Sequence, residues 1–275
     1  MAQMALFDQA YDVRAPAGVA VKGRVASGIL AKATGAIEKF CDYSLNPYVG
    51  CAFGCAYCYA AFFVPDEAQA RDWGNWVDIK VNALALLKRR TTDVAGKRIL
   101  IGSATDPYQP LEQRVRLTRA ILNLLAEVRP QPNVHVQTRS PFVEQDIELF
   151  QKFDHLTVGI SVTTDDESVR RRFEPRCAPI ERRLQAAERL AKAGVKVVLS
   201  LAPLLPVRDP ARFADRLRQV GASAIWTSFF RTGHGEFRAG TRPMALSLAR
   251  EMGWTERRYR ETVAELRKHL PLLRG

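Results

Sequence analysis

The sequence predicts an α/β fold: a partial (β/α)6 TIM-like barrel of parallel strands with outer helices. Six apolar, strand-like segments alternate with helix-like segments along the chain. The interiors of these strands are nearly continuously apolar, which is typical of parallel strands that are buried on both faces. A right-handed series of this length curls into a barrel or into part of one.

Each expected strand is a short apolar run, and the expected helices carry start and stop signals. Pro130 stops one helix and Gly194 closes another, whereas Ser140 and Pro141 open a third with a cap residue and a first-turn proline. The expected strands are 40–45, 98–104, 133–138, 156–163, 195–206 and 224–230. The expected helices are 77–90, 115–130, 180–194, 210–221 and 255–270, with one more that opens at Ser140.

Length and composition limit the domain organisation. The 275 residues suffice for one large α/β domain or two small ones, and 47% of them are hydrophobic. We expect an N-terminal arm over residues 1–36, the partial barrel over 37–232, and a C-terminal loop and helix over 233–275. No apolar run predicts a membrane span, and the first residues do not resemble a secretory signal, so a cytoplasmic location is expected.

The chain is strongly basic. Lys and Arg total 41 against 29 Asp and Glu, which gives a net charge of +12. This balance favours polyanionic partners such as nucleic acid. It is equally typical of a soluble surface or of a dock for an acidic protein.

Polar residues follow the carboxyl ends of the expected strands. Because barrels of parallel strands carry their chemistry at this rim, we expect these residues to converge on one site. They are Thr105 and Asp106 after the second strand, Arg139 and Ser140 after the third, residues 163–166 after the fourth, Pro203 after the fifth, and residues 231–234 after the sixth. A cysteine-rich loop follows the first strand.

Cys51, Cys55 and Cys58 lie in that loop with the spacing C-x3-C-x2-C. A structural zinc site would need a fourth ligand, from Cys41, a histidine or a carboxylate. A [4Fe-4S] cluster offers another account, since three cysteines hold three irons and leave the fourth iron open to a substrate group. Two glycines in the loop allow the backbone to wrap closely around such a cluster.

These three cysteines, with Tyr57 and Tyr59 beside the last one, resemble the motif of the radical S-adenosylmethionine (SAM) superfamily. Further stretches are similar to the spore photoproduct lyase-like branch of that superfamily, over about residues 40–206. They are GSATDPYQPLE after the second strand, TRS after the third, ISVTTDDESVRRRFEP around the fourth, and LAPLLP after the fifth.

The resemblance implies an enzyme with two cofactors, a [4Fe-4S] cluster and SAM. The open iron would chelate the amino and carboxylate groups of SAM, and an electron from the reduced cluster would split the sulfonium to give a 5′-deoxyadenosyl radical. The branch and the basic charge indicate that this radical abstracts hydrogen from a nucleobase, nucleoside or nucleic acid. A flavodoxin or ferredoxin-type reductant is the implied protein partner.

The resemblance also assigns roles to individual residues. The three loop cysteines are the expected cluster ligands, and Arg139, which stands where the family has a lysine, is expected to clamp the SAM carboxylate. The expected SAM-binding residues are Tyr57, Tyr59, Ser103, Thr105, Asp106, Arg139, Ser140, Ser161, Thr163, Ala202 and Pro203. Alternatives stay open: a helix cap for Ser140, backbone hydrogen bonds for Ser161 and Thr163, a core position for Tyr59, and a simple turn at Ala202 and Pro203.

One position departs from the resemblance. Ser103 stands at about the place where spore photoproduct lyases have a cysteine that donates hydrogen to the product radical, and a serine O–H is a far worse hydrogen donor. The spare thiols Cys41 and Cys177 are therefore candidate catalytic residues that replace this donor or meet a second cofactor. The alternative is that both are small buried hydrophobic residues.

Other charged residues have less specific expectations. Glu174 and Arg176 are expected to order a loop through an ion pair, and residues 165–167 to form an acidic cluster at a helix N-terminus. His234 lies on a rim loop, where it either meets substrate or is solvated.

Two other functions stay open on the sequence alone. One is a radical SAM enzyme of a small-metabolite biosynthetic pathway. The other is a zinc-stabilised nucleic-acid-binding module without catalysis. Metal analysis separates the zinc module from the cluster enzyme, and salt-sensitive binding to DNA separates a polymer substrate from a small metabolite.

Overall fold

The computed structural model describes residues 18–231 and 240–275. Its main sheet has eight strands in the order β11-β10-β9-β8-β7-β6-β3-β2. Six of them form a parallel series: β3 (Tyr43–Leu45), β6 (Arg98–Ile101), β7 (Asn133–Thr138), β8 (Leu156–Ser161), β9 (Lys196–Leu201) and β10 (Ala224–Thr227). The predicted partial barrel of parallel strands is therefore confirmed.

The two edges of this sheet are closed by short strands. β2 (Leu30–Lys32) pairs antiparallel with β3, and β11 (Leu273–Arg274) pairs parallel with β10. Every residue of β8 except Thr157 is buried, as expected for a central strand that is covered on both faces.

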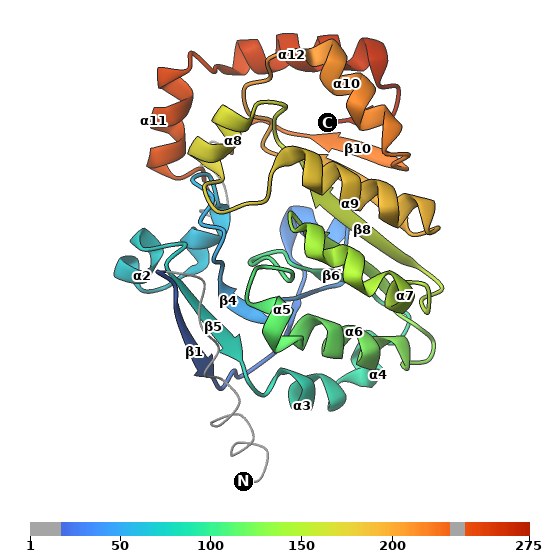
Figure 1. Ribbon diagram of the computed structural model, residues 1–275. Helices are drawn as coiled ribbons and strands as arrows, with labels where there is room; N and C mark the ends of the chain where they lie inside the picture. The colour runs from blue at the N-terminus through green and yellow to red at the C-terminus, as the bar shows by residue number, and fades with distance from the viewer. Residues whose placement is uncertain (1–17, 232–239) are drawn as a thin grey trace.

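Helices cover the outside of the sheet (Figure 1). The longer ones are α6 (Leu117–Ala126), α9 (Ile180–Lys192), α10 (Pro210–Gln219), α11 (Pro243–Glu251) and α12 (Glu256–His269). The shorter ones are α2 (Glu67–Arg71), α3 (Ala83–Lys88), α4 (Thr91–Val94), α5 (Glu112–Val115), α7 (Ile147–Phe150) and α8 (Glu167–Phe173), with 3-10 turns at η1 (Gly35–Lys39), η2 (Tyr59–Phe63) and η3 (Pro141–Asp146). In α6, Ile121, Leu122 and Leu125 are fully buried and form the apolar face that the sequence predicts.

A second, three-stranded sheet supports the cysteine loop. It has the order β1-β5-β4, with β1 (Ala20–Arg24), β5 (Trp76–Lys80) and β4 (Tyr48–Gly50). The predicted helix over residues 77–90 is wrong in its first part, because β5 occupies residues 76–80 and the helix begins only at α3. The aromatic and β-branched side chains of Trp76, Val77 and Ile79 favour a strand once neighbours on both sides bury them.

The expected strands are longer than the observed ones at their carboxyl ends. β6, β8 and β9 end at Ile101, Ser161 and Leu201, which leaves the following polar residues in loops. The cysteine loop follows β4 rather than the first strand of the main sheet. The division into arm, barrel and C-terminal part remains a prediction, although residues 20–24 are paired in a sheet.

No helix in the described parts of the chain is long and apolar enough to span a membrane.

Candidate active site

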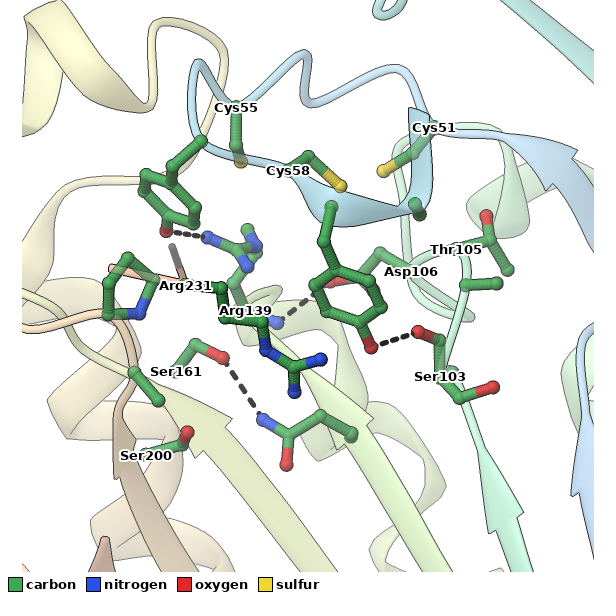
Figure 2. Close-up of a pocket in the computed structure, with 18 of the residues that line it drawn as sticks. Cys51, Cys55, Cys58, Ser103, Thr105, Asp106, Arg139, Ser161, Ser200 and Arg231 are labelled. Atoms are coloured by element: carbon green, nitrogen blue, oxygen red, sulfur yellow. Dashed lines mark hydrogen bonds between the residues drawn. The ribbon is translucent and has the colours of Figure 1, made fainter. Parts of the chain in front are cut away.

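A cavity of about 280 Å³ lies at the carboxyl ends of the parallel strands. Figure 2 shows the cysteine loop on one side of it and the strand ends with Ser161 and Ser200 on the other. The lining includes most of the predicted site residues: Cys51, Cys55, Cys58, Tyr57, Tyr59, Ser103, Thr105, Asp106, Arg139, Ser161, Ala202 and Pro203. The rim that the strand pattern predicted is therefore one continuous site.

The cysteine loop takes its path from close backbone packing. Gly74 has φ +111°, and a Cβ atom there would lie 2.7 Å from the Cα of Gly54. A Cβ atom at Gly54 would lie 3.3 Å from the Cα of Gly74, so Gly74 is the position where a side chain is excluded. Arg176 holds the same contact from outside, since its guanidinium donates to the carbonyls of Gly74 and Ala52. The predicted ion pair of Arg176 with Glu174 is not among its contacts; Glu174 pairs with Arg139 and Arg183 instead.

The three thiols are largely shielded from solvent, and Cys51 and Cys55 are buried. Burial raises the pKa of Cys58 to about 11, although the charges of Arg139 and Arg242 act in the opposite direction. The pKa of Cys55 is lowered, mainly by a hydrogen bond with Cys177. The charge of Arg139 lowers the pKa of both Cys55 and Cys58, but at Cys58 the effect of burial is larger.

The donor set fits a cluster better than a single ion. No group of three His, Cys, Asp or Glu side chains in the described residues is placed to hold one metal ion. Three thiols around one cavity suit a cluster, because each thiolate then binds a separate iron and the ligands need not converge on one point.

The loop after β6 is fastened to the cysteine loop by side chains. Thr105 donates from its hydroxyl to the carbonyl of Gly50 at 2.5 Å, and the side-chain amide of Gln109 donates to the Thr105 hydroxyl at 3.3 Å. The side-chain oxygen of Gln109 accepts from the backbone N–H of Ala52 at 2.8 Å. Thr105 and Gln109 therefore fix the distance between the thiols and the strand ends.

Asp106 organises the neighbouring strand ends. Its buried carboxylate accepts from the Thr138 hydroxyl at 2.6 Å, from the backbone N–H of Arg139 at 2.8 Å and from the backbone N–H of Tyr108 at 2.9 Å. Burial raises the pKa of Asp106, and these donors oppose that shift. Three protein donors bind the carboxylate, so Asp106 orients the residues on either side of it.

Ser103 and Tyr59 meet at the other wall. The Ser103 hydroxyl accepts from the side chain of Asn46 at 3.0 Å, and the Tyr59 hydroxyl donates to the Ser103 carbonyl. The guanidinium carbon of Arg231 lies 4.6 Å from the centre of the Tyr59 ring. Tyr59 is therefore a wall of the cavity with a cation stacked on it.

The floor of the cavity contains residues that the sequence reasoning missed. Gln137 donates to the Ser161 hydroxyl at 3.0 Å, and Ser200 stands opposite Ser161 in the pairing of β8 with β9. A Cβ atom at Gly159 would lie 2.2 Å from the side-chain oxygen of Gln137, so this glycine leaves room for that side chain. Ser200 is level with Ser161, and Gln137 is level with Gly159, which lies two residues before Ser161 on the same face of β8. This register comes from the structure and gives no signal in a single sequence.

Glu174 lies behind the cysteine loop and is fully buried. One carboxylate oxygen accepts from the Tyr57 hydroxyl, from the Thr163 hydroxyl at 2.8 Å and from the Arg139 guanidinium at 2.9 Å. The other oxygen lies 2.6 Å from the guanidinium of Arg183, an ion pair that lacks hydrogen-bond alignment. Although burial raises the pKa of Glu174, Arg183 and Arg139 hold it at about 2.

Some predicted residues lie outside the described cavity. Ser140 accepts from the backbone N–H of Phe142 at 3.3 Å and caps η3, which was its alternative role. Thr163 points to Glu174 instead of the cavity, because β8 ends at Ser161 and the chain turns there. Asp166 caps α8 by accepting from the N–H of Ser168, as the acidic cluster predicted. His234 lies outside the described residues.

The two spare thiols do not reach the cavity either. Cys41 precedes β3 and is buried at the amino ends of the strands, so its position argues against the predicted catalytic role. Cys177 lies behind the loop, with its sulfur 3.7 Å from that of Cys55. Among the lining residues that the structure describes, only the three loop cysteines carry thiols, so the hydrogen donor that the resemblance implies has no counterpart there.

Comparison with known proteins agrees with this geometry. The family model of the radical SAM superfamily matches residues 45–220. An uncharacterized protein of Methanocaldococcus jannaschii is 32% identical over 188 residues, which are 68% of each chain. A protein of Acidianus two-tailed virus is 29% identical over 60% of this chain and 56% of its own. The chain thus spans only about half the length of the viral relative.

Solved structures share the fold at low identity. Spore photoproduct lyase complexed with dinucleoside spore photoproduct is similar over 99% of this chain and 92% of that chain, with TM-score 0.64 and 13% identity. The radical SAM methyltransferase TsrM from Kitasatospora setae is similar over 76% of this chain and 38% of that chain, with TM-score 0.52 and 12% identity.

The site and these matches together define a radical SAM fold of the kind found in spore photoproduct lyase. The chain belongs to the radical SAM superfamily and is an enzyme. Its cofactors are accordingly a [4Fe-4S] cluster and SAM.

Proposed function

We propose that the enzyme abstracts hydrogen from a nucleobase, a nucleoside or nucleic acid held in the cavity, with Cys51, Cys55 and Cys58 as the cluster ligands. When bound, the cluster and SAM supply a 5′-deoxyadenosyl radical. The observation that carries the proposal is one cavity that has three thiols on one side and polar strand-end side chains on the other.

The choice of substrate class rests on charge and on fold. The net charge of +12 favours a polyanion, and Arg231 and Arg139 both line the cavity. The fold relative that holds a dinucleoside supports a nucleoside-like substrate here, although its 13% identity extends only to the fold.

The residues of the cavity suit distinct tasks in this proposal. Arg139 would bind the carboxylate of SAM, since its guanidinium lines the cavity and is oriented by Glu174. Gln137, Ser161 and Ser200 would offer hydrogen bonds to ribose or methionine atoms. Tyr59 would exclude water and pack against a ring.

A one-electron donor is also required. We propose a flavodoxin or ferredoxin-type protein in this role and the reducing cytoplasm as the location of the reaction. Reduction of the reconstituted enzyme by such a protein, instead of by dithionite, tests this partner directly.

The substrate is tested by isotope transfer. The reconstituted enzyme is incubated with SAM, reductant and deuterated nucleosides or short oligonucleotides, and the 5′-deoxyadenosine formed is analysed by mass spectrometry. Deuterium in 5′-deoxyadenosine is the expected result. If these compounds give none and a small non-nucleoside metabolite does, the biosynthetic alternative is the correct one.

Salt dependence separates a polymer from a nucleoside. Binding of a single-stranded oligonucleotide should weaken steeply between low and physiological salt, and Arg231→Gln should reduce the slope of that dependence. Arg257→Gln on α12 is the matched control, because this arginine is exposed on the outer surface. Oligonucleotide binding that does not respond to salt would contradict a polyanionic substrate.

A further inference from the structure

A buried group of charges lies directly behind the cysteine loop. It consists of Glu174, Arg183 and Arg139, and we call it the Glu174 cluster. The side chains of Glu174 and Arg183 are fully buried, and only Arg139 reaches the cavity, with 17% of its side chain exposed. Buried charges are costly unless they are paired, and here Glu174 pairs with both arginines.

The Glu174 cluster joins three separate parts of the fold and contacts a fourth, the cysteine loop. Glu174 follows α8, Arg183 lies on α9, Arg139 follows β7, and Tyr57 belongs to the cysteine loop. Glu174 is the common partner. One of its oxygens accepts hydrogen bonds from Tyr57 and Arg139, and the other forms an ion pair with Arg183. The orientation of Arg139 toward the cavity therefore depends on Glu174.

Arg183 is itself held in place by the backbone. Its guanidinium donates to the carbonyl of Ala178 at 2.9 Å and to the carbonyl of Ser161 at 3.3 Å. Because Arg183 occupies one oxygen of Glu174, the carboxylate shares only its other oxygen with Arg139. Without Arg183, the full negative charge of Glu174 would be directed at Arg139.

The Glu174 cluster lies close to Cys55, one of the proposed ligands of the iron–sulfur cluster. Tyr57 is two residues from Cys55, and Cys177, three residues after Glu174, touches the sulfur of Cys55 at 3.7 Å. The charges of Arg139 and Arg183 lower the pKa of the Cys55 thiol, and the charge of Glu174 raises it. Other charged groups lie nearby. Arg170 pairs with Glu167 and donates from its guanidinium to the backbone carbonyl of Glu174 at 3.1 Å. Asp106 accepts from the backbone N–H of Arg139, and the charge of Arg242 also acts on Cys55.

We propose that Glu174 and Arg183 are positioning residues that set the reduction potential of the iron–sulfur centre and aim Arg139 at the cavity. Neither residue lines the cavity, so both act through Arg139, Tyr57 and the electrostatic field at Cys55. This inference rests on the proposed function, in which Cys51, Cys55 and Cys58 hold the iron–sulfur cluster. Charge and hydrogen bonding around the sulfurs are established determinants of cluster potential.

The test uses two substitutions that change the charge in opposite directions. Full-length protein is reconstituted anaerobically, and the midpoint potential is measured without SAM by redox titration followed by electron paramagnetic resonance. Glu174→Gln removes a negative charge, so the potential should shift upward. Arg183→Met removes a positive charge, so the potential should shift downward.

A double variant covers the case in which a single variant does not fold. Glu174→Gln with Arg183→Met removes the pair together and leaves no unpaired buried charge from it. Its potential should return close to that of the unaltered protein. As controls, Glu256→Gln and Arg260→Met alter an exposed pair on α12 and should leave the potential unchanged.

The outcomes separate this inference from the proposed function. If the midpoint potentials of the two single variants shift in the same direction, or if neither shifts, the inference is overturned. The proposed iron–sulfur site is not affected by that result. A double variant whose potential departs as far as that of either single variant also overturns it. If the unaltered protein takes up no iron, the proposed function fails and the cause lies in the cluster site.

Discussion

Glu112 shows at the residue scale how burial controls protonation. The carboxyl group is 1% exposed and accepts from the Tyr48 hydroxyl and from the backbone N–H of Arg119 at 3.1 Å. Burial raises its pKa from 4.5 to about 7, and the hydrogen bonds only partly oppose this shift. The folded protein thus holds a proton on Glu112 at a pH where the unfolded chain has released it.

We predict that Glu112 makes the protein less stable as the pH rises. Below pH 4.5 both states are protonated, whereas between pH 4.5 and 7 only the unfolded chain ionises, so the free energy of unfolding falls. The loss is about 3 kcal/mol once the pH exceeds 7. Denaturant unfolding at pH 5 and pH 8 should show a smaller loss for Glu112→Gln than for the unaltered protein. Equal losses in the two proteins would contradict this assignment.

Single residues also mark the limit of reasoning from sequence. Spacing identified Cys51, Cys55 and Cys58 as candidate ligands because all three come from one short loop. Cys41 and Cys177 carry no such local signal, and their surroundings depend on strand order and on the path after α8. Glu174 was underestimated for the same reason, since its partners Arg139 and Arg183 are brought together only by the fold.

At the scale of elements, the cysteine loop depends on the small sheet β1-β5-β4. Gly54 in the loop and Gly74 just before β5 approach so closely that a Cβ atom at Gly74 would meet the Cα of Gly54 at 2.7 Å. The contact holds the loop over the cavity without any hydrogen bond between these two residues. The position of the thiols is thus set partly by an element outside the barrel.

We predict that Gly74→Ala loosens the cysteine loop. Its φ of +111° and the clash with Gly54 should together lower the free energy of unfolding by about 2 kcal/mol. The iron content after reconstitution should fall as well. Gly253→Ala is the matched control, because Gly253 has φ +62° but no atom lies within 4 Å of the place where its Cβ atom would stand. Equal iron content in the two variants would show that the Gly54–Gly74 contact does not position the thiols.

The prediction of helices and strands succeeded where one hydrophobic pattern dominates. It failed where a strand pattern runs directly into a helix pattern. The parallel strands β7, β8 and β9 were found because apolar runs flanked by helices are distinctive. Residues 77–80 were assigned to a helix because the basic, leucine-rich segment of α3 follows directly. Gln137 and Ser200 were missed because their facing depends on strand register, which one sequence does not reveal.

At the scale of the whole molecule, the partial barrel gathers distant segments at one rim. The cysteine loop, the last residue of β8 and the loops after β6, β7, β9 and β10 all contribute to one cavity. Because parallel strands end at the same edge, this convergence could be predicted from the sequence. The identity of the substrate could not, because it depends on the shape of the cavity and not on the topology that creates it.

The central claim is that three thiols of one loop hold an iron–sulfur cluster at which SAM is cleaved. The most direct test measures iron, sulfide and 5′-deoxyadenosine in anaerobically purified protein, beside a variant with Cys51, Cys55 and Cys58 changed to alanine. Cys41→Ala is the control, since this thiol lies away from the cavity. The account predicts about four irons and four sulfides, with 5′-deoxyadenosine formed from SAM and dithionite by the unaltered and Cys41→Ala proteins but not by the triple variant. Stoichiometric zinc in place of iron, or undiminished SAM cleavage by the triple variant, would contradict it.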